Sequence, residues 1–219
     1  MDRLEDAPAS RRASVDSGPM TPHEIQLSKR FFRATEWAAS RHEDDAREGR
    51  PSLGQVLGIA SLVLEDGGTE REAIAAMALD ALGDDDVAFD ELREQFGKKV
   101  ARLVVRCRDG REAGVATRVE RLEREDDESV RRVLASDTVR ELRALVVSVR
   151  HSGSVAFARF AIPPGEQMDN YQAILQVFTR HDPRGTLTEE VRHALGELRR
   201  IAELDAATAA WQVAHTDAA

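Results

Sequence analysis

The 219-residue chain has almost no cysteine and no long apolar run. Its single cysteine, Cys107, cannot form a disulfide within the chain, which excludes a disulfide-stabilised scaffold. No apolar stretch approaches the roughly 18 residues that a membrane-spanning helix needs. The first residues also lack the apolar core of a signal peptide. These absences lead us to expect a cytoplasmic protein with no membrane partner.

Positive charge is scarce relative to negative charge. The chain carries 31 Lys and Arg against 40 Asp and Glu, a formal net charge of −9. Proteins that bind nucleic acids usually present a basic face, so we expect no nucleic-acid partner. The acidic excess belongs either to a metal or catalytic site or to a solvated surface.

Helix start and stop signals divide the chain into a succession of short helices. Ser, Pro, Arg and Asp dominate residues 1–20, which carry no apolar periodicity, so we expect a disordered tail there. Capping boxes, in which Ser or Thr is followed three residues later by Glu or Gln, open at Thr21, Ser52 and Thr69. Gly97 ends a further helix and separates it from the next one.

Apolar residues recur at helical spacing behind these signals. The second expected helix should bury one stripe of five residues, namely Leu53, Val56, Leu57, Ala60 and Leu64. The same spacing runs over residues 130–149 and 168–178 and from Thr188 through Ile201, and no alternating strand pattern occurs. We therefore expect an all-α, multi-helix bundle that forms a single domain over residues 21–205, followed by an Ala-rich tail over 206–219.

Asp80 is the most informative single residue because it lies in the most apolar stretch of its helix, residues 75–82. An ionised carboxylate in such a place is costly unless a metal, a cation or hydrogen-bond donors compensate it. The alternative is that Asp80 lies near the helix end and faces water or a neighbouring arginine. The residue types leave both interpretations open.

The chain resembles the HD superfamily, and more narrowly the hydrolase domain of RelA/SpoT-type alarmone enzymes. The clearest similarity covers Ala60–Gly68, the helix that contains Asp80, and Phe96–Val104, with a weaker signature in Phe157–Phe160 and Tyr171–Ala173. The resemblance implies an all-α fold. It also implies the removal of pyrophosphate from the 3′ position of guanosine tetra- or pentaphosphate with a Mn²⁺-type metal.

Members of that family hold the metal with a histidine, then a His-Asp pair, then a distant aspartate. These positions fall on His42, on Leu79-Asp80 and on Asp109. The resemblance thus implies a site of His42, Asp80 and Asp109, with an apolar leucine in place of the second histidine. One histidine and two carboxylates would bind Mn²⁺ or Mg²⁺ only weakly.

Two further positions of the family's catalytic centre also differ. The catalytic Glu-Asp pair falls on Gly83-Asp84, which leaves Asp84 as the candidate catalytic residue. Losing the glutamate removes a proton-transfer group, which typically contributes ~10²–10⁴-fold to the rate. The helper histidine falls on Gln55, which could add an oxygen ligand but more simply completes the helix cap after Ser52.

The nucleotide contacts implied by the resemblance are only partly kept. Arg47 matches the arginine that stacks on guanine, and Arg143 is kept in a later segment. The lysine after the first arginine is Glu48 here, and an expected asparagine is Glu141. Added carboxylates repel a polyphosphate, so both changes argue against the family's own substrate.

The sequence leaves three possible functions. We favour a degenerate HD domain that no longer hydrolyses alarmones and acts as a regulatory or nucleotide-binding module, with a guanine nucleotide as a possible ligand. The alternative is a Mn²⁺- or Mg²⁺-dependent phosphohydrolase that uses His42, Asp80 and Asp109. A helical interaction protein with an unidentified protein partner is the third reading.

Overall fold

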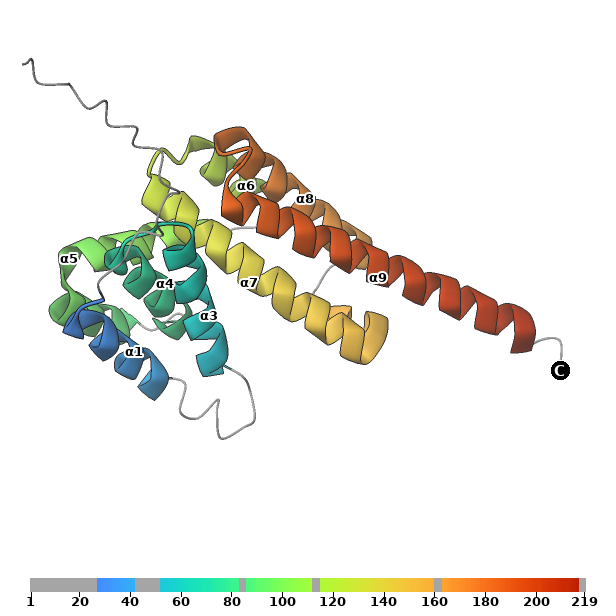
Figure 1. Cartoon of the computed structure of the whole chain (residues 1–219), viewed down its shortest axis with the longest axis horizontal. Helices are drawn as coiled ribbons and strands as arrows, with labels where there is room; N and C mark the ends of the chain where they lie inside the picture. Colours follow the sequence, from blue (N-terminus) through green and yellow to red (C-terminus); the bar gives the residue numbers. More distant parts are fainter. Residues whose placement is uncertain (1–26, 42–51, 83–85, 112–114, 160–162, 217–219) are drawn as a thin grey trace, which may run out of the picture.

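The computed structural model describes residues 27–41, 52–82, 86–111, 115–159 and 163–216. Within these ranges every regular element is helical, which confirms the expected all-α fold (Figure 1). The elements are α1 (Lys29–Arg41), α3 (Ser52–Glu65), α4 (Glu70–Leu82), α5 (Asp86–Arg111), α6 (Val115–Arg124), α7 (Glu128–Ser152), the 3₁₀ helix η1 (Gly153–Arg159), α8 (Pro164–His181) and α9 (Thr186–Thr216). None of the described helices is long and apolar enough to cross a bilayer.

Helix α7 connects the two halves of the molecule. It packs against α3, α4 and α5 through its N-terminal part and runs beside α9 over its length (Figure 1). Helix α4 lies inside the first half, between α1, α3 and α5. Every residue from Glu72 to Leu79 in α4 is buried, as expected of a helix that is apolar on all sides.

The cap of α4 forms as the sequence predicts. The hydroxyl and the backbone N–H of Thr69 donate to a carboxylate oxygen of Glu72 at 2.5 and 2.6 Å, and the N–H of Glu72 donates to the Thr69 hydroxyl at 3.3 Å. Gly97 breaks α5 with φ 79° and ψ 163°, which confirms the predicted helix end there. The capping box predicted at Thr21 lies outside the described residues.

The predicted face of α3 is wrong in part. Leu53 and Leu57 are 38% and 42% exposed, whereas Val56, Ile59 and Val63 are fully buried. The buried stripe follows the i, i+3, i+7 spacing from Val56, because α3 packs against both α4 and α7. The two leucines lie beside that stripe rather than on it.

The ends of two helices also differ from the sequence reading. Helix α1 begins at Lys29, since the Ser28 hydroxyl accepts a hydrogen bond from the N–H of Arg30 at 3.1 Å and so caps the helix. Helix α9 continues to Thr216, through most of the segment expected to be a tail after residue 205, and extends beyond the body of the molecule (Figure 1).

Candidate functional site

An arginine occupies the surroundings of Asp80. Arg140, on α7, places its Nη2 at 3.7 Å from Oδ1 of Asp80, near the end of α4. The same guanidinium donates to Oδ1 of Asp137, one turn earlier on α7, from Nη2 at 2.8 Å and from Nε at 3.2 Å. Of the two interpretations of Asp80, the neighbouring arginine is the one that the structure supports.

Arg140 stays charged in this position. Burial lowers the pKa of its guanidinium, but the negative charges of Asp137 and Asp80 outweigh that effect and raise the pKa above its ordinary value. The side chain of Asp137 is fully buried and that of Asp80 is 14% exposed. A permanent cation therefore compensates two carboxylates that would otherwise be costly to bury.

A second arginine, Arg118 of α6, contacts α7 beside Arg140. Its Nη2 donates to the hydroxyl of Thr138 at 3.2 Å, and its Nη1 lies 3.8 Å from a carboxylate oxygen of Glu141. Arg118 is 9% exposed, and its buried Nε has no hydrogen-bond partner among the described residues. Its charge is therefore matched less closely than that of Arg140.

Two adjoining hollows open beside these arginines. The first, of about 330 Å³, is lined by Gln55, Arg118, Arg140, Glu141, Ala144, Gln167 and Tyr171. The second, of about 510 Å³, is a groove between α3 and α7 lined mainly by small and apolar residues: Gly54, Gln55, Gly58, Leu62, Arg140, Arg143, Ala144, Val147 and Ser148. They share Gln55, Arg140 and Ala144, so one ligand could occupy both.

These residues do not fit the metal centre that the resemblance implies. Leu79 is buried and offers no ligand atom, and Asp80 already lies beside the Arg140 guanidinium. Across the described part of the chain, no group of three or more His, Cys, Asp and Glu side chains could hold a metal ion. His42 lies outside the described residues, as do Arg47, Glu48 and Asp84.

Asp109 is placed apart from the Arg140 cluster. It is an exposed residue near the end of α5, where it lines a separate hollow of about 320 Å³ with Arg106 and Arg121. Its carbonyl oxygen accepts a hydrogen bond from Arg121. The structure thus pairs Asp80 with Asp137 through Arg140 and does not bring Asp109 to that cluster.

The other described candidates, Arg143 and Gln55, lie at the α3–α7 groove. Arg143 lines the α3–α7 groove; its side chain is 53% exposed, and its guanidinium pairs with Glu190 of α9 at 2.7 Å. Gln55, for which a helix cap is the simpler reading, points its side-chain oxygen at Arg140, 3.5 Å from Nη1.

Sequence reasoning missed Asp137, Arg140 and Arg118. The missed signal was the same one that identified Asp80, a carboxylate inside an apolar helix, because Asp137 lies among buried residues of α7 from Val133 to Val139. The Asp-x-x-Arg spacing also places the two side chains one turn apart on the same helix face.

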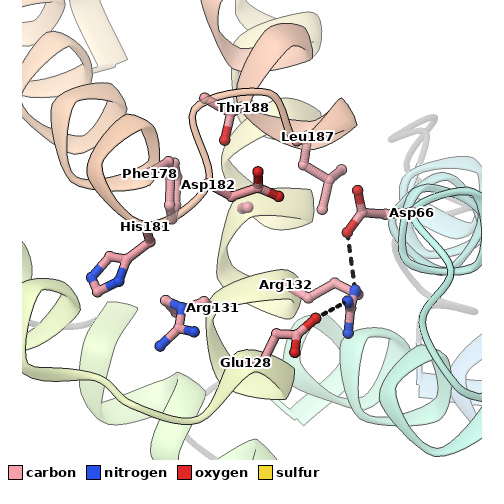
Figure 2. Close-up of a pocket in the computed structure, with 11 residues that line it drawn as sticks. Asp66, Glu128, Arg131, Arg132, Phe178, His181, Asp182, Leu187 and Thr188 are labelled. Atoms are coloured by element: carbon pink, nitrogen blue, oxygen red, sulfur yellow. Dashed lines mark hydrogen bonds and ion pairs between the residues drawn. The ribbon is translucent and has the colours of Figure 1, made fainter.

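A further hollow, of about 260 Å³, lies near the start of α7 and the turn between α8 and α9 (Figure 2). At its edge Arg132 contacts three carboxylates, those of Asp66 at 2.9 Å, Glu72 at 2.8 Å and Glu128 at 2.5 Å. Each carboxylate engages a different guanidinium nitrogen, so this arginine joins α4 and α7 to the turn that follows α3. We interpret the cluster as structural.

The all-α arrangement around α4 and α7 is that of an HD domain. Residues 34–181, most of the chain, match the HD domain family, and the chain belongs to it. Two proteins named guanosine-3′,5′-bis(diphosphate) 3′-pyrophosphohydrolase are similar. The one from Aquifex aeolicus (strain VF5) is 33% identical over 90 residues, which is 41% of this chain and 13% of that protein. The one from Danio rerio, MESH1, is 37% identical over 75 residues, which is 33% of this chain and 41% of that protein.

A solved structure extends the likeness to most of the fold. It is described as a metazoan ortholog of SpoT that hydrolyzes ppGpp and plays a role in starvation responses. It superposes with a TM-score of 0.61 at 16% identity, covering 79% of this chain and 97% of that one. The chain is therefore an HD-type domain similar to alarmone hydrolases, and its alignments span less than half the length of both curated relatives.

Proposed function

We propose that this HD domain does not hydrolyse alarmones and serves as a binding or regulatory module. The observation that carries the proposal is the position of Arg140, whose guanidinium lies between Asp80 and Asp137. In a metal-dependent hydrolase the corresponding carboxylate must be available to a metal ion. Here a metal would have to compete with a tethered, permanently charged side chain.

The loss of ligand atoms supports the same conclusion. Leu79 cannot coordinate a metal, and Gly83, which follows in the sequence where the related enzymes carry a glutamate, cannot transfer a proton. A guanidinium also differs from a metal in what it can do, because it neutralises charge but does not lower the pKa of a bound water to make a nucleophile. A ligand can still bind in the hollows beside Arg140 after these changes, whereas metal-assisted hydrolysis would lack its ligand and proton-transfer groups.

The hollows beside Arg140 give such a module room for a ligand. Together they provide arginines at one end and an apolar groove at the other, the combination that small-molecule sites usually show. A guanine nucleotide is the ligand that ancestry suggests. Arg143 in the groove is a candidate contact for it.

A pyrophosphate-release assay tests the proposal. Purified chain is incubated with Mn²⁺ and guanosine tetraphosphate, beside the Asp80→Asn variant and an Asp90→Asn control on an exposed part of α5. We expect equal background release from all three proteins. Metal-dependent release that is lost in Asp80→Asn and kept in Asp90→Asn would overturn the proposal and favour the phosphohydrolase alternative.

A further inference from the structure

The cavity lined by Arg118 and Arg140 has the properties of a phosphate site that needs no metal. Two guanidinium groups and one carboxylate, that of Glu141, line it, and the carboxylates of Asp137 and Asp80 that neutralise Arg140 lie behind the wall. Gln55 and Gln167 add amide groups to the same wall. Arginine is the residue best suited to phosphate oxygens, because its planar fork presents several donors at fixed angles.

Arg118 provides the strongest argument. Arg118 as a residue is 9% exposed, yet its hydrogen bond to a protein group goes to the neutral hydroxyl of Thr138. The carboxylate of Glu141, at 3.8 Å, lies beyond hydrogen-bonding distance, and the buried Nε has no partner within the described structure. A buried charge that is left this poorly matched is unfavourable, and an oxyanion in the cavity would supply the missing acceptors.

Arg140 differs because its charge is already shared with Asp137 and Asp80, which lie behind it. These carboxylates fix the guanidinium at the wall where the two hollows meet. A phosphate would therefore be bound principally by Arg118 and positioned by Arg140. The ligand's remaining part would extend past Ala144 into the α3–α7 groove.

We propose that the cavity between α6, α7 and α8 binds the phosphate group of a small molecule without a metal ion, through Arg118 and Arg140. This inference rests on the proposed function, since it assigns a ligand class to the same pocket. The volume of about 330 Å³ is at the lower end of small-molecule sites and suits a single phosphate head group. The groove of about 510 Å³ beside it suits an attached apolar or planar body.

The test uses the full chain in EDTA, titrated with inorganic phosphate while its thermal unfolding midpoint is followed. We expect a saturable rise of about 2–5 °C once phosphate exceeds its dissociation constant about tenfold. Potassium chloride at matched ionic strength should not reproduce that rise. Arg118→Gln should abolish the rise, whereas Arg124→Gln, on the exposed side of the same helix, should keep it.

A second variant keeps the test decisive if Arg118→Gln folds poorly. Ala144→Met narrows the junction of the two hollows without changing any charge. We expect it to weaken a nucleoside monophosphate at least tenfold and inorganic phosphate less, because the body of the ligand loses its path into the groove. Equal weakening of both would place the ligand wholly in the smaller cavity and overturn the extension into the groove.

Several outcomes would overturn the phosphate site itself. They are the absence of a saturable effect in the wild type, an equal effect of chloride, an effect that requires Mn²⁺, and an effect kept in a folded Arg118→Gln. Each is distinguishable from failure of the proposed function, which would appear as pyrophosphate release in the separate assay. A chain that hydrolyses alarmones and also binds phosphate in EDTA would refute the first proposal and keep the second.

Discussion

Two arginines of α7, about 12 Å apart along the helix axis, meet carboxylates in different ways. Arg132 uses three nitrogens on three carboxylates at 2.5–2.9 Å. Arg140 directs two nitrogens to one oxygen of Asp137 and lies 3.7 Å from Asp80. Arg132 directs all three guanidinium nitrogens to carboxylates, whereas Nη1 of Arg140 faces the neutral side-chain oxygen of Gln55 at 3.5 Å. The comparison separates a structural ion cluster from one that lies on the wall of a binding site.

Removing Arg132 should have the largest effect. Arg132→Met leaves the buried carboxylate of Glu72, 2% exposed, without its cation, so we expect the free energy of unfolding to fall by about 3–5 kcal/mol. Urea denaturation measures the change. Arg124→Met, which removes an exposed pair, should change it by less than about 1 kcal/mol. A similar loss in both variants would contradict the structural role of Arg132.

Removing Arg140 should cost less and should be reversible by a second change. Arg140→Met leaves Asp137 buried, and we expect a loss of about 2–3 kcal/mol. Asp137→Asn in the same chain removes the buried charge and should restore most of the loss, as a double-mutant cycle in urea would show. Additive losses in the double variant would mean that the two side chains stabilise the fold independently.

The Arg132 cluster should also give the stability two opposite pH dependences. Burial raises the pKa of Glu72, but hydrogen bonds from Thr69, Ser129 and Arg132 outweigh it, and the net pKa lies below its ordinary value of 4.5. Glu72 therefore contributes stability above that pH, and the contribution is lost as the pH falls through the lower, folded-state pKa. For Asp66 burial dominates and raises the pKa above 3.8, so its effect has the opposite sign.

Unfolding free energies measured across this acidic range separate the two residues. Glu72→Gln should remove the part of the profile in which stability rises with pH. Asp66→Asn should remove the part in which stability falls with pH. Profiles unchanged by both substitutions would show that the cluster does not titrate in this way.

The smallest signal is the reactivity of Cys107. Its thiol is fully buried, and burial, followed by the negative charge of Asp137, raises its pKa. We expect no reaction with a thiol reagent in the native state, so that labelling reports opening of the fold. Labelling should accelerate more in Arg132→Met than in Arg140→Met. The reverse order would mean that Arg140 stabilises the fold around Cys107 more than Arg132 does.

Much of the fold could be predicted from local sequence signals. The cap at Thr69 and the break at Gly97 depend on neighbouring residues alone, and both form as predicted. Which face of α3 is buried depends instead on two partner helices, which is why Leu53 and Leu57 were misassigned. Tertiary packing decided between two stripes that the sequence alone does not distinguish.

The candidate site could be predicted less well, for a related reason. Asp80 was identified because an acid in an apolar helix is conspicuous within one segment. Its partner Arg140 lies 60 positions later, and nothing in the local sequence joins the two. Asp109 was placed in the site by resemblance, but the structure puts it beside Arg106 and Arg121 at another hollow. Contacts between distant segments are what the sequence pattern does not encode.

Calorimetric titration of the metal-free chain with Mn²⁺ tests the central claim most directly. If the Arg140 guanidinium compensates Asp80 and Asp137, the wild type should show no stoichiometric Mn²⁺ binding, and Asp80→Asn should give the same baseline. Stoichiometric binding by the wild type that disappears in Asp80→Asn would contradict the account, because Asp80 would then serve a metal rather than an arginine.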